Sequence, residues 1–201
     1  MKVLFLEIVL GLGLFATGTT AYQVSRITGR LVVLETESGN IVIEMLPEIA
    51  PHHVQNFEEL IAQGFYDGTL FHRIVAKSRT RRMAIQGGDP NTIHGDPETW
   101  GFGQPWQKTV PAEFSSTMKH VRGIVSMARK QIDEDSATSQ FFICCEAEPQ
   151  WDGQYSIFGQ VVKGIEVVDA IAAGPTIRYT DRPVSPVRIR HARLVNSVEA
   201  K

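Results

Sequence analysis

Cysteine is scarce in this sequence of 201 residues, and its two cysteines, Cys144 and Cys145, are neighbours. Adjacent residues of an extended strand point to opposite faces, so we do not expect these thiols to bond to each other. A disulfide framework would need more cysteines, and a CxxC motif would need another spacing. The sequence therefore excludes a small disulfide-stapled fold.

An excess of charge of either sign is also missing. Twenty lysines and arginines stand against 22 aspartates and glutamates, which gives a formal net charge of −2. This balance provides no overall field that would attract nucleic acid or an anionic surface. We therefore expect no nucleic-acid partner.

Motifs of hydrolysis, metal binding and phosphate binding are missing as well. The sequence has no GxSxG elbow and no HExxH pair, and Gln86–Pro90 lacks both the lysine of a P-loop and a following helix. His52 and His53 are adjacent and would diverge on a helix, which argues against a metal pair. We expect no metal and no other cofactor. The histidines interpreted as surface or turn residues are His94, His120 and His191.

The N-terminal residues carry an apolar run from Val3 to Ala16, interrupted by Glu7 and followed by small residues up to Ala21. This pattern predicts a signal peptide over residues 1–21, or a membrane anchor over 3–21, with a linker over 22–29. The alternative is a first strand or helix of the fold, although the run has neither a period of 2 nor one of 3.6. The first two interpretations predict a periplasmic, extracellular or membrane-anchored protein rather than a cytoplasmic one.

From Arg30 onward, short strands alternate with turn residues. A hairpin over 31–45 turns at residues 38–40, and amphipathic helices are predicted over Ile49–Gln63 and Ile165–Ala173. Further strands are predicted over residues 70–75, 83–87, 123–128, 140–145, 155–162 and 187–195. This pattern favours one mainly-β domain over residues 30–196, a closed eight-stranded antiparallel barrel capped by two α-helices, because closure leaves no strand edge exposed. Residues 197–201 would form a C-terminal tail.

Two irregular segments interrupt the strands. Residues 89–114 are rich in glycine, proline and tryptophan, and their length is typical of a functional loop. Trp100 and Trp106 are expected to edge a ligand groove or to pack against the barrel. The second segment, residues 76–82, is basic, and a solvated surface is its simpler interpretation. The alternative is that its charges shape the rim of a site or select acidic ligands; they are Lys77, Arg79, Arg81 and Arg82.

Three segments combine a hydrogen-bonding side chain with apolar neighbours: Phe71–Ile74, Gln86–Asp89 and Ser139–Ile143. On a strand, Phe71 and Arg73 would share one face while His72 and Ile74 would share the other, so one of the two polar side chains faces inward and has to be paired. Gln140 and Phe142 likewise share a face. An amide beside an aromatic ring suits a polypeptide ligand.

Together these segments resemble the cyclophilin family of peptidyl-prolyl cis-trans isomerases, and its bacterial branch most closely. The segments that carry the resemblance follow the family's order: Phe71–Ile74, Gln86–Pro90, Gly123–Ala128, Ser139–Ile143 and Asp152–Gly159. The resemblance implies an eight-stranded barrel capped by two helices. It also implies an enzyme without a cofactor, expected to be a monomer, that accelerates rotation about X-Pro bonds in proline-containing polypeptides.

Residue by residue, the resemblance makes Arg73 the catalytic arginine and Gln86 the neighbour that binds the substrate carbonyl. A donor aimed at the prolyl nitrogen favours the twisted amide, and a permanently charged guanidinium suits that role. The substrate-binding residues carried over are Phe142 as the floor of the proline pocket, Met83 and Tyr155 as its walls, Met127 nearby, and Phe71, Ala128, Arg129, Gln140 and Trp151 along the groove.

Three features depart from the family pattern. Gln150 and Trp151 stand where some members have tryptophan and leucine, which leaves binding of cyclosporin-type ligands open. The segment between Arg73 and Gln86 and the loop over residues 91–108 are both longer than usual. Two other functions compete with the enzyme: a module that binds proline-containing segments without turnover, and a chaperone that holds unfolded chains on exposed tryptophans.

Overall fold

The computed structural model of the chain describes residues 30–78 and 80–195. The predicted signal peptide or anchor, the linker, Arg79 and the C-terminal tail lie outside the described residues. Within the described ranges, the helices are all too short or too polar to cross a membrane.

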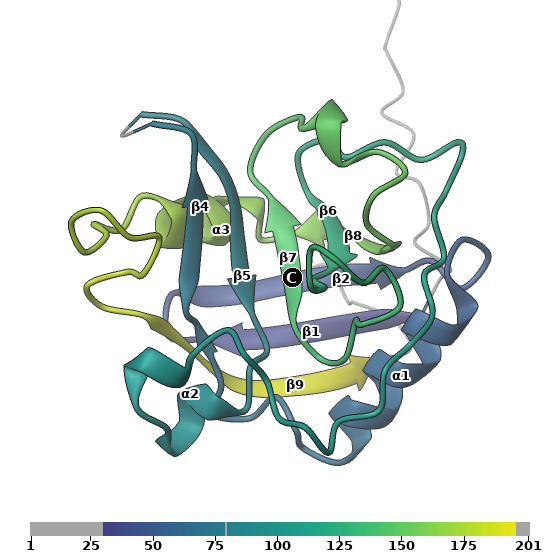
Figure 1. Cartoon of the computed structure of the whole chain (residues 1–201), viewed down its shortest axis with the longest axis horizontal. Coiled ribbons are helices and arrows are strands. Elements are labelled where there is room, and N and C mark those ends of the chain that lie inside the picture. The colour runs from purple at the N-terminus through teal and green to yellow at the C-terminus, as the bar shows by residue number, and fades with distance from the viewer. Residues whose placement is uncertain (1–29, 79, 196–201) are drawn as a thin grey trace, which may run out of the picture.

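The nine strands found in residues 30–78 and 80–195 form one antiparallel sheet that curls into a nearly closed barrel (Figure 1). The strands are β1 Leu31–Thr36, β2 Gly39–Met45, β3 Leu70–Phe71, β4 Arg73–Ala76, β5 Arg82–Gly87, β6 Ile124–Met127, β7 Phe141–Cys144, β8 Ile157–Lys163 and β9 Val187–Val195. Their order in the sheet is β3-β9-β1-β2-β8-β6-β7-β5-β4. The edge strands β3 and β4 follow each other in the chain, so the two edges of the sheet meet at His72.

The prediction of an antiparallel barrel is confirmed, but its strand count and its closure are corrected. The single strand expected over residues 70–75 is broken at His72, because β3 pairs with β9 whereas β4 pairs with β5. His72 is the point where the chain leaves one ladder and joins another. The strands on either side therefore do not share one alternation of faces.

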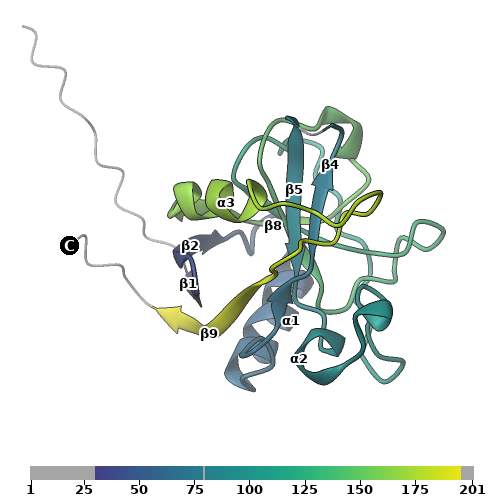
Figure 2. The ribbon, with the colours of Figure 1, turned by 90° about the vertical axis from the view of Figure 1, so that its left-hand side faces the viewer.

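Three α-helices accompany the barrel in the described part of the chain: α1 Pro51–Ala62, α2 Asn91–His94 and α3 Ile165–Ala172. The two predicted helices, α1 and α3, lie on either side of strands β1 and β2 (Figures 1 and 2). The one-turn helix α2 corrects the expectation that no helix follows Gln86–Pro90. It is stabilised by Asp89, whose side chain accepts a hydrogen bond from the Asn91 N–H and whose carbonyl accepts one from the Thr92 hydroxyl.

Helix α1 begins at the predicted proline and is capped by a residue from a distant loop. Its N-cap position, Ala50, makes no side-chain hydrogen bond. The carboxylate of Glu113 accepts hydrogen bonds from the N–H groups of His52 at 3.2 Å and His53 at 3.0 Å. This contact satisfies orphan donors of the first turn and ties the long loop before β6 to the helix.

Two apolar clusters lie on opposite faces of the sheet. The larger one fills the barrel and includes Phe57, whose ring centroid lies 4.8 Å from that of Tyr66 and 4.9 Å from that of Phe158. The smaller one lies on the outer face and contains Phe142 and Cys144, while Phe141 and Cys145 belong to the barrel cluster. The expectation that the two cysteines point to opposite faces is confirmed, and both thiols are free.

Candidate active site

A row of side chains crosses three neighbouring strands on the outer face of the barrel. The register pairs Arg73 of β4 with Gln86 of β5, and Gln86 with Phe142 of β7. Residues directly opposite each other in an antiparallel sheet point to the same face. A guanidinium, an amide and an aromatic ring therefore lie side by side, and we call these three residues the outer row.

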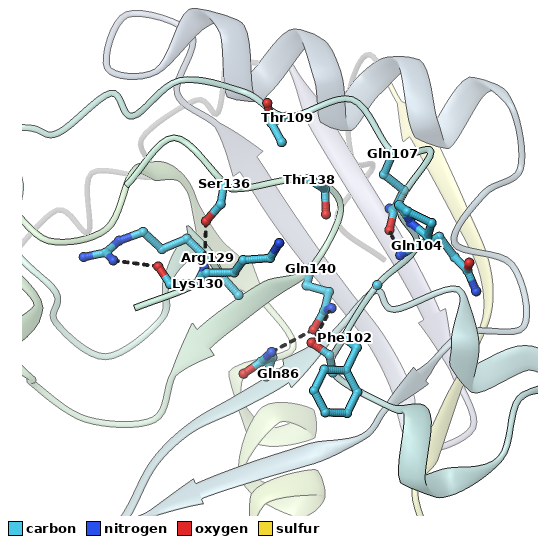
Figure 3. A pocket seen from close by; sticks show the side chains of 14 residues that line it. Gln86, Phe102, Gln104, Gln107, Thr109, Arg129, Lys130, Ser136, Thr138 and Gln140 are labelled. Carbon is cyan, nitrogen blue, oxygen red and sulfur yellow. Dashed lines mark hydrogen bonds between the residues drawn. The ribbon is translucent and has the colours of Figure 1, made fainter. Parts of the chain in front are cut away.

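Hydrogen bonds orient the amide in this row. Arg73 Nη1 donates to Gln86 Oε1 at 3.4 Å, and Gln86 Nε2 donates to Gln140 Oε1 at 2.9 Å. Gln140 Nε2 in turn donates to the carbonyl of Gly101 at 3.0 Å. The chain of contacts turns the carbonyl end of Gln86 toward the guanidinium, and Figure 3 shows the two glutamine amides meeting.

The guanidinium of Arg73 has a second partner that the sequence does not indicate. Arg73 Nε and Nη2 donate to Asp181 Oδ2 at 3.0 and 2.9 Å. Asp181 is 108 positions away in the chain and belongs to none of the segments singled out above. The side chain of Arg73 is 48% exposed, so the group is accessible to a polypeptide.

Aromatic rings surround the third member of the row. Phe142 packs edge-on against Trp151 and Tyr155, with ring centroids 5.1 and 5.3 Å apart. It also stacks on His120 at 6.1 Å. Ala128 packs against the same outer cluster. The structure thus brings four of the expected binding residues together: Ala128, Phe142, Trp151 and Tyr155.

His120 corrects the interpretation of this residue as a surface or turn histidine. Its side chain is buried beneath Phe142, with Nδ1 3.0 Å from Asp152 Oδ1 and Nε2 3.0 Å from Ser126 Oγ. Burial lowers the pKa of His120, although its hydrogen bond with Asp152 acts in the opposite direction. The sequence offers no signal that His120 packs against Phe142, because its hydrogen-bond partners Asp152 and Ser126 come from other segments.

Phe71 and Met127 are placed inside the barrel. Both are fully buried in the large cluster, and Phe71 packs edge-on against Phe141 at 5.9 Å. Both side chains pack against the inner face of the sheet. Their position therefore gives no support to the expected contact with substrate.

Met83 is half-buried on β5, opposite an irregularity of the β4–β5 register. Its neighbour Ala84, and not Met83, packs in the outer cluster with Phe142. The proline-pocket wall expected at Met83 stays a prediction.

The expectation that His72 and Ile74 share one face while Phe71 and Arg73 share the other is wrong: Phe71 and Ile74 both lie in the barrel cluster, whereas His72 lines a recess together with Arg73. The side chain of His72 is buried, with Nδ1 3.4 Å from the Leu70 carbonyl, while Nε2 has no hydrogen-bond partner among the described residues. Burial lowers the pKa of His72, although the nearby Asp89 carboxylate acts in the opposite direction. The neutral form of the His72 ring is therefore favoured.

A cavity of about 500 Å³ adjoins the outer row (Figure 3). Gln86 and Gln140 form one side of it, and Ala128 and Arg129 border it too. Its remaining lining is mostly polar: Gly101, Phe102, Gly103, Gln104, Pro105, Gln107, Thr109, Lys130, Ser136 and Thr138. The side chain of Arg129 lies 5.0 Å above the Tyr155 ring, which places it between the cavity and the aromatic cluster.

The long loop forms the outer wall of this cavity and is held by its own polar residues. Asp89 accepts a hydrogen bond from the Gly101 N–H, and Asn91 Nδ2 donates to the carbonyls of Thr99 and Gly103, each at 3.0 Å. Trp100 lines a second recess, of about 460 Å³, beside Arg73. Trp106 instead lines a recess against helix α1. One tryptophan thus edges the site and the other does not.

Part of the basic segment, residues 76–82, forms ion pairs. Arg81 Nε lies 2.7 Å from Glu146 and its Nη2 lies 3.0 Å from Glu148, whose side chain is completely buried. Lys77 is exposed. The interpretation of these side chains as solvated surface charges is therefore wrong for Arg81, because it pairs with two carboxylates from a distant part of the chain.

Among residues 30–78 and 80–195, no three histidine, cysteine, aspartate or glutamate side chains are grouped so that they could hold a metal ion.

Known proteins are similar to this chain in sequence and in fold. The sequence model of the cyclophilin type peptidyl-prolyl cis-trans isomerase/CLD family matches residues 31–194. Peptidyl-prolyl cis-trans isomerase 9 of Schizosaccharomyces pombe is 38% identical over 168 residues, which are 83% of this chain but 25% of that protein. A probable peptidyl-prolyl cis-trans isomerase of Brucella suis is 36% identical over 143 residues, 71% of each chain.

A solved structure agrees with these matches. The crystal structure of a cyclophilin type peptidyl-prolyl cis-trans isomerase of Cryptosporidium parvum superposes with a TM-score of 0.72 at 28% identity, covering 83% of this chain and 97% of the other. The same Cryptosporidium protein was also crystallised in the presence of the dipeptide Ala-Pro. Relatives from a yeast and a bacterium are about equally similar, so they do not place the chain in the bacterial branch. The match over residues 31–194, together with the fold, shows that the chain belongs to the cyclophilin-type peptidyl-prolyl cis-trans isomerases.

Proposed function

We propose that the outer row is where this isomerase rotates X-Pro bonds of proline-containing polypeptides. The observation that carries the proposal is the register that sets Arg73, Gln86 and Phe142 side by side on the outer face of the barrel. The Ala-Pro dipeptide used with the Cryptosporidium relative supports a proline-containing ligand.

The reaction needs no covalent chemistry. Rotation about a peptide bond faces a barrier of about 18–20 kcal/mol, because the C–N bond has partial double-bond character. The barrier falls when the prolyl nitrogen becomes pyramidal and its lone pair withdraws from the carbonyl. Arg73 lies where its guanidinium can donate to that nitrogen, and the donor stabilises the twisted amide more than either planar form.

One hydrogen bond accounts for part of the acceleration. A hydrogen bond from a charged donor contributes about 1.5–3 kcal/mol, which is roughly one to two powers of ten in rate. The remainder comes from holding the two sides of the bond in a reactive geometry. In this proposal Phe142, Trp151, Tyr155 and the half-buried Met83 hold the proline ring.

The acyl side of the substrate is held by polar groups. Gln86 uses one amide N–H for Gln140, and in this proposal its second N–H donates to the substrate carbonyl. Ala128, Arg129 and Gln140 line the cavity, and Ala128 packs in the outer cluster while Gln140 bonds to Gln86 of the outer row. The residues that precede the proline are therefore proposed to run along Ala128 and Arg129 into the cavity.

Replacement of Arg73 by alanine tests this assignment. We expect Arg73→Ala to lower kcat/KM on an X-Pro peptide by roughly 10- to 100-fold, the contribution of one charge-assisted hydrogen bond. A protease-coupled peptide assay measures the rate, and far-UV circular dichroism checks the fold. Arg82→Ala is the matched control, because Arg82 is a half-buried arginine of the same hairpin outside the outer row. Wild-type turnover in Arg73→Ala would remove Arg73 from its role.

We also propose that the protein works outside the cytoplasm, either exported or held at a membrane. The apolar run of residues 3–16 and the small residues up to Ala21 support this location. Mass spectrometry of the mature N-terminus tests it, with cleavage near Ala21 expected for a signal peptide. A placement in the bacterial branch stays a prediction.

A chaperone activity is the second function that we propose, and exposed aromatic side chains favour it. Phe102 and Trp106 are 79% and 68% exposed. Large exposed apolar groups provide contacts for unfolded chains. If this activity is independent of turnover, Arg73→Ala suppresses aggregation of an unfolded protein as well as the wild type does, whereas a double Phe102→Ser/Trp106→Ser variant does not.

A further inference from the structure

Arg73 is held on one side by a carboxylate and on the other by an amide. A guanidinium has five N–H donors. Asp181 accepts from Nε and Nη2, and Gln86 accepts from Nη1. One N–H on each of Nη1 and Nη2 is left for a further acceptor.

The carboxylate of Asp181 is itself placed by the backbone. The Asp181 carbonyl accepts a hydrogen bond from the Ile74 N–H at 2.7 Å, next to Arg73 on β4. The loop that carries Asp181 is closed at its base by the Val184 N–H, which donates to the Pro175 carbonyl at 2.8 Å. Arg182, the next residue, pairs with Glu98 of the long loop at 3.1 Å. Backbone hydrogen bonds and an ion pair therefore hold in place the loop that carries the Asp181 carboxylate.

A contribution to folding stability does not explain why Arg73 and Asp181 form an ion pair. The side chains of Arg73 and Asp181 are both partly exposed to solvent. Exposed ion pairs contribute little to the free energy of folding, because water screens them and two side chains lose freedom. Precise placement of a catalytic donor, by contrast, strongly affects a rate.

We propose that Asp181 is a positioning residue, which fixes the guanidinium of Arg73 so that its free end faces the prolyl nitrogen. This inference rests on the proposed role of Arg73. Arginine has several rotatable bonds, and without the carboxylate the donor samples many positions in which it does not meet the amide. Asp181 contacts no substrate in this arrangement and acts through Arg73.

The test measures kcat and KM separately for Asp181→Ala and Asp181→Asn. We expect Asp181→Ala to lower kcat roughly tenfold with little change in KM, since donor placement and not the binding surface is altered. Asp181→Asn keeps an acceptor of the same shape and should recover part of the loss. Asp169→Ala is the matched control, because it removes another partly exposed arginine–aspartate pair, that of Arg122 with Asp169 on α3, which lies outside the outer row and the loop of Asp181. Its kcat should equal that of the wild type.

A double variant identifies the path of the effect. If Asp181 acts through Arg73, adding Asp181→Ala to Arg73→Ala causes no further loss of kcat. A further tenfold loss in that background, or a kcat of Asp181→Ala equal to or above the wild-type value, overturns the inference while the role of Arg73 stands. Full activity in Arg73→Ala removes the proposed role of Arg73 and the inference with it.

Discussion

At the scale of single residues, Phe141 and Phe142 show how one position in a strand separates core from site. Phe141 lies in the barrel cluster and Phe142 in the outer cluster, against Trp151 and Tyr155. We expect both Phe→Leu changes to lower the free energy of unfolding by roughly 0.5–3 kcal/mol, because each removes part of a buried ring. Only Phe142→Leu should also raise KM severalfold for an X-Pro peptide.

The two variants serve as controls for each other. Chemical denaturation gives the free energies of unfolding, and peptide titration gives the affinities. Equal KM values for Phe142→Leu and Phe141→Leu would make Phe142 a core residue without a role in binding.

At the scale of elements, the β4–β5 hairpin is anchored to the loop before η2 (Pro149–Trp151) by Arg81. The carboxylate of Glu148 is buried and also accepts a hydrogen bond from Gln150. Removing the arginine leaves a buried charge without its cation. We expect Arg81→Ala to lower the free energy of unfolding by about 1–3 kcal/mol, measured by urea denaturation.

Arg82→Ala provides the comparison for the hairpin, since Arg82 makes neither of the Arg81 contacts. Its loss should be well below that of Arg81→Ala. If both variants unfold at the same urea concentration, the ion pairs with Glu146 and Glu148 do not anchor the hairpin.

At the scale of the whole molecule, three buried histidines make stability depend on pH. Burial lowers the pKa of His53, His72 and His120, while nearby carboxylates act in the opposite direction. Unfolding returns these groups to an ordinary pKa of about 6.5, so the unfolded state binds more protons below that pH. Stability is therefore complete above pH 6.5 and falls as the pH decreases toward the folded-state pKa values.

Urea denaturation at pH 7.5 and pH 5.5 measures this effect. Each proton taken up on unfolding gives a slope of about 1.4 kcal/mol per pH unit. His53→Leu should flatten the dependence, because the ring nitrogens of His53 have no hydrogen-bond partner among the described residues. Equal free energies of unfolding at the two pH values would contradict the prediction. Burial acts to raise the pKa of Asp152, but the hydrogen bonds from His120 together with the nearby charge of Lys119 lower it overall, so that carboxylate affects stability only at lower pH.

Local pattern was sufficient for most of the fold. Apolar alternation and turn residues predicted the strands, and Pro51 with the apolar spacing of the following residues predicted α1. The break at His72 could not be predicted, because two consecutive strands choose different partners there. The same limit applies to the faces of Phe71 and Arg73, since alternation holds only within one unbroken strand.

For the site, sequence motifs were enough to single out Arg73, Gln86, Gln140 and Phe142, because each lies in a short segment of characteristic composition. The partners of these residues could not be predicted from the sequence: His120 packs against Phe142, and Asp181 pairs with Arg73. A hydrogen bond or ion pair between distant segments leaves no periodic trace along the chain. Which strands pair, which ring is covered and which carboxylate meets the guanidinium are settled when the barrel curls and brings those segments within a few ångströms of one another.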